Sequence, residues 1–216
     1  PTLAVTISSP FTTTAASLVK SGRGTLILTG TNSYTGGTTI NEGTLEIAGA
    51  SNIGTGGILF SGGTLKFGGA WDPSTQTITI GPAGGTLDTN GNNIALAGSI
   101  GNNGTGTLTK SGAGSLALGA AATYTGGTVI TTGSLVYGLD NALAPSGNVS
   151  LSGSAILDLA GYDAGTGLVT IAGTAQVSSS SGTGSSTLTT SARIAAQAGS
   201  IPAGVIVAGT GGLLKT

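Results

Sequence analysis

The sequence predicts an all-β fold, a parallel β-helix in which successive coils of the chain stack on one another. Three observations favour this fold. A segment of 26 residues occurs twice without a gap, short apolar triplets recur mostly every 19 to 22 residues, and glycine pairs stand between the triplets. A fixed internal period of this kind is typical of solenoids, in which each repeat contacts mainly its neighbours.

The duplicated segment occupies residues 20–45 and 110–135, at an offset of 90. The first copy reads KSGRGTLILTGTNSYTGGTTINEGTL and the second reads KSGAGSLALGAAATYTGGTVITTGSL. A third copy begins at 209–216, where GTGGLLKT is similar to the GTGTLTKS of 104–111. The motif positions shared by the first two copies are Lys20, Gly24, Leu26, Tyr34, Gly36, Gly37 and Gly43, and Lys110, Gly114, Leu116, Tyr124, Gly126, Gly127 and Gly133.

The triplets fall on two ladders of strands. Side chains alternate along a strand, so the outer residues of each triplet point inward and the middle residue points outward, as in the Leu-Glu-Ile of 45–47. Glycine suits the corners because they need positive φ. The first ladder contains 38–40, 58–60, 78–80, 128–130, 149–151, 169–171 and 205–207, and the second contains 26–28, 45–47, 65–67, Leu87, Leu108, 135–137, 157–159 and Val177.

The coils form one continuous solenoid domain. We divide it into an N-terminal strand at the edge of the solenoid (1–19), a first super-repeat (20–109), a second super-repeat (110–214) and the start of a further repeat (215–216). The alternation in 2–7 predicts a strand, and the low-complexity SSSSGTGSS of 178–186 predicts an exposed loop.

The composition excludes several classes of protein. The 216 residues include 42 glycines, no His, Cys or Met, and only 6% charged residues, with a net charge of −1. A disordered Gly/Ser linker is the alternative to a solenoid, but the positive mean hydropathy and the recurring triplets argue against it. The charge balance gives no reason to expect a nucleic acid as partner, and no apolar run is long enough to insert in a membrane.

One outward column of charge is expected on the second ladder. Glu46, Lys66 and Asp88 occupy the same outward position on successive coils, which would give a stack of alternating sign. Exposed pairs of this kind contribute roughly 0–1 kcal/mol, so we interpret the column as a marker of register.

The motif closely resembles the autotransporter-associated β-strand repeat, also called the passenger-associated transport repeat. The resemblance rests on K-[ST]-G-x-G-[ST]-L, Y-T-G-G-T and x-G-[ST]-L, and it covers most of 18–216. It implies a right-handed parallel β-helix, here of about ten rungs of 19–22 residues. It also implies a large secreted or surface protein of a Gram-negative bacterium, whose repeat assists passage and folding at the outer membrane. The family carries no catalytic residues to transfer.

The residues themselves give no case for an enzyme or for a cofactor. Without His or Cys, a His-dependent triad and a Cys nucleophile are both excluded. Carboxylate pairs remain, because parallel β-helices also host polysaccharide lyases and hydrolases, but the six basic residues are scattered. The DTNGNN of 88–93 fits an Asn-Gly β-turn better than a calcium loop. The pairs considered are Glu42/Glu46, Asp72/Asp88 and Asp158/Asp163.

Three kinds of residue have both a structural and a ligand-binding interpretation. We expect Lys20, Lys110 and Lys215 to mark the entry to a coil or to solvate its outside. Tyr34 and Tyr124 are expected to cover the Gly-Gly corner with the hydroxyl on a backbone partner, the alternative being a ring that stacks on sugars. Trp71 is the best candidate for a surface contact, the alternative being a cover over the core.

The leading functional hypothesis is a non-catalytic structural β-helix of a bacterial cell-surface or secreted protein, an autotransporter passenger or stalk and in some members an adhesin. Its partners would be the rest of a larger surface protein and a host or matrix surface. A second hypothesis is an extracellular filament, because the chain ends inside the motif at 213–216 and identical subunits would stack end to end. A third is a β-helix that binds or cleaves glycans.

Overall fold

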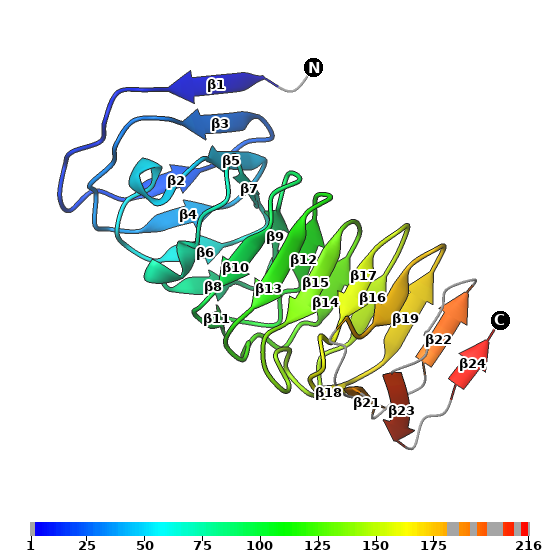
Figure 1. The fold of residues 1–216 in the computed structure, drawn as a ribbon. Helices are drawn as coiled ribbons and strands as arrows, with labels where there is room; N and C mark the ends of the chain where they lie inside the picture. Colours follow the sequence, from blue (N-terminus) through cyan, green and yellow to red (C-terminus); the bar gives the residue numbers. More distant parts are fainter. Residues whose placement is uncertain (1–2, 181–185, 191–193, 198–204, 210–212, 216) are drawn as a thin grey trace.

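The computed structural model describes residues 3–180, 186–190, 194–197, 205–209 and 213–215. They form a parallel β-solenoid of about nine turns, drawn as a rod in Figure 1. The only helical segments in these ranges are two short 3₁₀ turns, η1 (Ala50–Asn52) and η2 (Pro73–Thr75). The predicted all-β solenoid is therefore confirmed. No helix within these ranges has the length and apolar character of a membrane span.

The strands form four parallel sheets, here called A to D. Sheet A contains β1 (Ala4–Ile7), β3 (Thr25–Leu28), β5 (Thr44–Ile47), β7 (Thr64–Phe67), β9 (Gly85–Asp88), β12 (Leu108–Ser111), β14 (Thr128–Ile130), β16 (Val149–Leu151), β19 (Val169–Ala172), β22 (Ile194–Gln197) and β24 (Leu213–Lys215). Sheet B contains β2 (Leu18–Lys20), β4 (Thr38–Ile40), β6 (Ile58–Phe60), β8 (Ile78–Ile80) and β11 (Ile100–Asn102). Sheet C contains β10 (Ile94–Leu96), β13 (Ser115–Leu118), β15 (Ser134–Tyr137), β17 (Ile156–Asp158) and β20 (Gln176–Ser178). Sheet D contains β18 (Ala164–Thr166), β21 (Ser186–Thr190) and β23 (Val205–Gly209).

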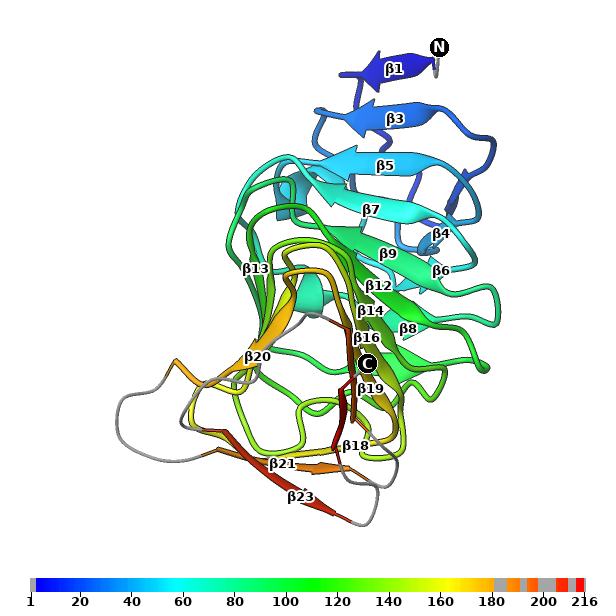
Figure 2. The same cartoon turned by 90° about the vertical axis from the view of Figure 1, so that its right-hand side faces the viewer.

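Sheet A runs the whole length of the rod, and Figure 2 shows it along one side with sheets C and D on the other sides. The core lies between the sheets and is built from in-register columns of apolar side chains. Leu45, Leu65 and Leu87 are consecutive partners in sheet A, and all three are fully buried. The buried–half-buried–buried pattern of strands such as β4 and β6 confirms the predicted alternation of side chains.

The assignment of strands to two continuous ladders is wrong after residue 80 in the first ladder and after Leu108 in the second. β14 does not continue the column of β8 but pairs with β12 in sheet A. Likewise β15 pairs with β13 in sheet C and not with the strand at Leu108. The cause is one coil that contains three strands, β9, β10 and β11, which lie in sheets A, C and B. After this extra strand, the first-ladder triplets at 128–130, 149–151 and 169–171 lie in sheet A, and the second-ladder residues 135–137, 157–158 and Val177 lie in sheet C. The triplet at 205–207 lies in sheet D.

The two copies of the motif consequently occupy different faces. In the first copy, β2 lies in sheet B and β3 in sheet A. In the second copy, the equivalent strands β12 and β13 lie in sheets A and C. The shared motif thus builds the same local structure after a rotation by one face, because it specifies a corner and not a side of the rod.

Both ends of the chain contribute strands to sheet A. β1 pairs with β3 over Ala4–Ile7, where the sequence predicted a strand. β24, which holds Lys215, pairs with β22. The predicted serine-rich loop lies between β20 and β21, and its residues 181–185 fall outside the described residues.

Candidate functional site

The lysine of the second motif copy is completely buried, although it carries a charge. Lys110 starts from an inward position of β12, between Leu87 of the preceding coil and Ile130 of the following coil. Its ammonium group reaches the corner between β12 and β13, where five oxygens within hydrogen-bond distance share its three N–H donors. These are Thr89 Oγ1 at 3.0 Å, Ser111 O at 3.0 Å, Gly112 O at 2.5 Å, Gly114 O at 2.7 Å and Thr132 O at 3.0 Å.

The first copy repeats this arrangement. Lys20 is 5% exposed, and its ammonium group donates to Ser21 O at 3.1 Å, Gly22 O at 2.6 Å and Glu42 O at 3.0 Å. These three acceptors are equivalent to Ser111, Gly112 and Thr132 in the second copy. The interpretation of Lys20 and Lys110 as outward solvating charges is therefore wrong, because corner carbonyl groups replace water around each ammonium ion.

The motif glycines make room for these corners. Gly22 and Gly112 have φ of 73° and 80°, and Gly43 and Gly133 have φ of 62° and 67°, all in the left-handed region that favours glycine. Gly133 also lies directly against the lysine, since a Cβ atom there would stand 2.6 Å from Lys110 Nζ. The K-S-G-x-G and x-G-[ST]-L elements thus form two corners that stack on each other in consecutive coils.

Gly24 and Gly114 are required by a close approach and not by φ. A Cβ atom on Gly24 would stand 2.6 Å from the Leu3 carbonyl oxygen, and one on Gly114 would overlap the Asn92 carbonyl. Next to them, Leu26 is half-buried and Leu116 is buried. Coils of the solenoid therefore touch backbone to backbone at these positions.

Burial is the main influence on the charge of Lys110. It lowers the pKa of the ammonium group from 10.5 to about 8, while the negative charge of Asp88 acts in the opposite direction. A pKa of about 8 leaves the protonated form dominant at neutral pH. That form suits the site, because every neighbouring atom it contacts is a hydrogen-bond acceptor.

The motif tyrosines are also part of the interior. Tyr34 is 2% exposed and Tyr124 is 1% exposed, so neither ring is open to a sugar and the sugar-stacking alternative is wrong. Each hydroxyl shares a hydrogen bond with a threonine side chain, Thr38 Oγ1 at 2.8 Å and Thr128 Oγ1 at 2.7 Å, and not with the backbone as expected. Burial raises the pKa of Tyr124 above its ordinary range.

The Gly-Gly pairs form the corner that follows each tyrosine. Gly37 and Gly127 have φ of 87° and 89°. Gly36 is needed for space, because a Cβ atom there would stand 2.6 Å from the Ala16 carbonyl oxygen, and Gly126 is similarly crowded by Thr105 and Gly106. The Y-T-G-G-T element therefore ends the long loop between two strands of the coil and directs the chain into the next strand.

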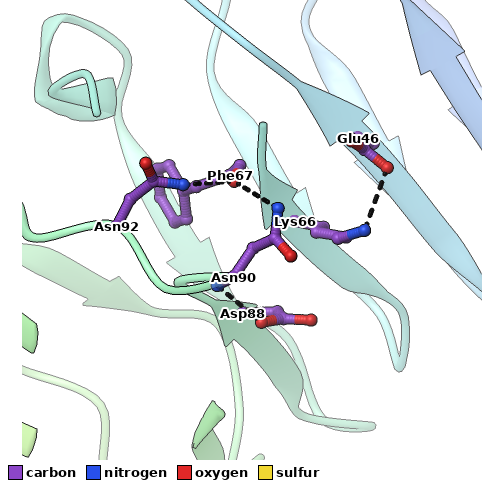
Figure 3. A network of polar contacts seen from close by, with 6 residues as sticks. All are labelled: Glu46, Lys66, Phe67, Asp88, Asn90 and Asn92. Atoms are coloured by element: carbon purple, nitrogen blue, oxygen red, sulfur yellow. Dashed lines mark hydrogen bonds and ion pairs between the residues drawn. The ribbon is translucent and has the colours of Figure 1, made fainter. Parts of the chain in front are cut away.

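The column of charge on sheet A is drawn in Figure 3. Glu46 pairs in register with Lys66, and Lys66 pairs in register with Asp88. Lys66 Nζ lies 3.2 Å from Glu46 Oε2. Asp88 turns away and accepts instead from the Asn90 backbone N–H at 2.8 Å. Only the first two members of the column form an ion pair.

The asparagine-rich segment after β9 is a tight turn that is attached to the neighbouring coil. Asn90 and Gly91 have φ of 49° and 83°. The Asn92 side-chain amide donates to Phe67 O at 2.9 Å, and the Asn90 amide does so at 3.3 Å (Figure 3). Within the described part of the chain, no group of three or more acidic, His or Cys side chains could hold a metal ion.

Trp71 covers the edge of the core. Its indole N–H donates to Ile47 O at 3.1 Å, and its ring lies 5.6 Å from the ring of Phe67. The residue is only half-buried. The contacts fit the alternative interpretation of Trp71 as a lid over the core.

Three of the six carboxylates considered for catalysis bind backbone N–H groups of neighbouring coils. Asp72 accepts from Ala97 N at 3.2 Å, Asp158 from Ser180 N at 2.8 Å and Asp163 from Thr187 N at 2.7 Å. Sequence reasoning missed this function, and it also missed asparagines that do the same. Asn148, for example, accepts from Leu168 N at 2.8 Å. The available signal was the presence of Asp or Asn near a corner, where side-chain oxygens pair with exposed N–H groups.

Comparison with known proteins agrees with the geometry of the corners. A family model described as Passenger-associated-transport-repeat matches residues 18–47 and 108–136, the two segments that hold the buried lysines. The chain is 40% identical over 144 residues to the Adhesin BmaC autotransporter of Brucella suis biovar 1 (strain 1330). This match covers 65% of the chain and 4% of the much longer relative. No solved structure matches. The chain therefore contains two segments that match the passenger-associated transport repeat, and both lie in one parallel β-solenoid.

Proposed function

We propose that the chain is a non-catalytic structural segment of a bacterial surface or secreted passenger, in which the stacked coils form a stiff rod that projects other parts of the protein. The observation that carries this proposal is the inward use of the motif. Lys110 and Tyr124 are buried, and their polar atoms bind only groups of the chain itself. A repeat whose distinctive side chains are used inside the coils and between them is suited to building a rod.

The acidic residues support the same conclusion. Asp72, Asp158 and Asp163 each bind a backbone N–H group of a neighbouring coil. A general acid or base needs a proton-exchanging group that is free to face a substrate. In this chain, those carboxylates stabilise the joints of the solenoid. Neither comparison favours the filament or the glycan hypothesis.

The proposed location is the outer surface of a Gram-negative-type bacterium. Antibodies raised against the folded chain should label intact cells that produce it. Cells permeabilised before labelling, and cells labelled for a cytoplasmic protein, are the controls. A signal that arises only after permeabilisation would rule out a surface role.

Adhesion is a second candidate function, favoured by the 40% identity to a segment of an autotransporter adhesin. Beads coated with the folded chain should then attach to host cells or extracellular matrix more than beads coated with the urea-unfolded chain. Equal attachment of the two kinds of beads would leave the rod without adhesive activity of its own.

A further inference from the structure

We propose that Lys20 and Lys110 act as latches, which means that each buried ammonium group binds its motif to the following coil. The contacts between coils at the two motif corners are then the most resistant to opening in the rod. The proposal rests on the structural function given above and deepens it, because it assigns the repeat a task during folding. Other joints of the rod rely on apolar columns and neutral or carboxylate hydrogen bonds. Among the described residues, Lys20 and Lys110 are the only buried cationic side chains.

The partners of the ammonium group carry the first step of the argument. Each lysine donates to its own corner and also to a carbonyl group 22 residues further along, Glu42 O for Lys20 and Thr132 O for Lys110. The distant carbonyl belongs to the following coil. Lys110 also donates to Thr89 on the preceding coil, so this one side chain joins three coils.

The position of the lysine in its column carries the second step. Lys20 is followed by Ile40, and Lys110 lies between Leu87 and Ile130, all of which are buried apolar residues. A coil that docked out of register would place the ammonium group against apolar atoms without its acceptors. A buried charge without hydrogen bonds costs several kcal/mol, so only the native register is tolerated at this joint.

The order of events follows from these contacts. Until the following coil has docked, the ammonium group lacks its distant carbonyl acceptor and its corner stays open to water. Docking of that coil supplies the acceptor and covers the charge at once. A folded stretch that ends in a closed latch is therefore held while the rest of the chain is still unfolded.

The glycines of the following coil provide a matched set of variants. In Gly133→Ala, the new Cβ atom would overlap the carbonyl oxygens of Gly114 and Gly112, both acceptors of Lys110, and would stand 2.6 Å from Lys110 Nζ. In Gly43→Ala, it would overlap the carbonyl oxygens of Gly22 and Gly24, and Gly22 is an acceptor of Lys20. Gly153→Ala is the control, because φ is 62° there, as at Gly43, but the new atom would meet only Thr131 O at 3.3 Å.

The test is pulsed acylation of the full chain with acetic anhydride, with each lysine read by mass spectrometry and the half-exposed Lys66 as the reference for an open amine. We expect Lys20 and Lys110 to react far more slowly than Lys66 in the unchanged chain. Gly133→Ala should raise the rate at Lys110 roughly tenfold or more and leave Lys20 unchanged, as expected for the loss of one charged hydrogen bond. Gly43→Ala should do the reverse, and Gly153→Ala should alter neither rate.

Three results would overturn the proposal. Lys110 and Lys66 reacting equally fast would show that the corner is not closed. Equal effects of Gly133→Ala and Gly153→Ala on Lys110 would show that backbone strain is the cause. A response of both lysines to either glycine would show that the coils open together. If Gly133→Ala does not fold, Leu135→Val on the same coil serves in its place. None of these results depends on surface location, which the antibody experiment tests separately.

Discussion

The ammonium group of Lys110 donates a 3.0 Å hydrogen bond to the carbonyl oxygen of Thr132, which lies 22 residues further along the chain and one coil further along the rod. Lys20 and Glu42 repeat this bond at the same distance and the same sequence separation. The bond is a charged contact between backbone and side chain in the interior of an otherwise apolar stack.

Replacing Lys110 with Met should destabilise the chain strongly. The variant keeps the apolar stem but removes the ammonium donor from five oxygens, of which Ser111 O and Gly114 O keep backbone N–H donors. An acceptor that is left buried and unsatisfied costs about 1–3 kcal/mol. Allowing for relaxation, we expect a loss on the order of 3 kcal/mol in urea unfolding followed by circular dichroism, and a smaller loss for Lys20→Met. Lys66→Met is the control and should cost at most about 1 kcal/mol, because its ion pair is partly exposed. Equal losses for Lys110→Met and Lys66→Met would contradict the buried role.

The stability of the chain should rise with pH through the range in which Lys110 titrates. Its pKa is lowered from 10.5 to about 8, so between these values the unfolded state binds more protons than the folded state. By linkage, the contribution of this group to stability increases as pH rises through that window. Between pH 7.5 and 9.5 we expect the free energy of unfolding of the unchanged chain to gain about 1–2 kcal/mol relative to Lys110→Met. A constant difference would mean that burial does not perturb this amine.

Removing a tyrosine hydroxyl should have opposite consequences at two buried positions. Tyr124→Phe deletes a hydrogen bond and leaves Thr128 Oγ1 without that partner, which should cost about 1 kcal/mol in thermal or urea unfolding. Tyr137 faces the Leu143 backbone, but its buried hydroxyl has no partner within hydrogen-bond geometry. Tyr137→Phe should therefore be neutral or slightly stabilising. If the two variants lose the same stability, the Tyr124 hydrogen bond makes no contribution of its own to the free energy of unfolding.

Trypsin should distinguish the motif lysines from other basic residues. Cleavage requires the side chain to leave the protein and enter the protease, and both Lys20 and Lys110 are buried. We expect the folded chain to be cut at the exposed Arg23 before Lys20 and Lys110, and cleavage after Lys110 to become fast only in urea. Peptide mapping by mass spectrometry over a time course measures both. Early cleavage after Lys110 without denaturant would show that this corner opens readily.

The sequence predicted the solenoid and most of its strands because the apolar triplets report directly on the core. Leu45 and Leu65 were correctly placed on adjacent coils, and the register of Glu46 with Lys66 follows from them. The sheet that each strand of the second half joins was not predictable in this way. Ile94–Leu96 and Ile100–Asn102 resemble any other short strand, and nothing in their composition shows that both belong to one coil with a third occupied face.

The lysine corners were missed for a different physical reason. Charge is a reliable sign of exposure when only side chains are considered. The groups that solvate Lys20 and Lys110 are mostly backbone carbonyls, and these are present at every residue. The clue was the set of glycines around the lysine, since a corner that bends its carbonyl groups toward one point needs residues such as Gly112 and Gly133 with positive φ.

The rotation between the two motif copies gives the spacing of repeats a geometric meaning. Lys20 lies on sheet B, whereas Lys110 and Lys215 both lie on sheet A. The number of strands between two repeats therefore determines which face of the rod the second repeat occupies. A whole number of coils keeps the long Tyr-Thr-Gly-Gly loop on one side of the rod, and one additional strand turns it to the next. Inserting or deleting a single short strand would change the side of the rod from which those loops project, and the structure of each corner would stay the same.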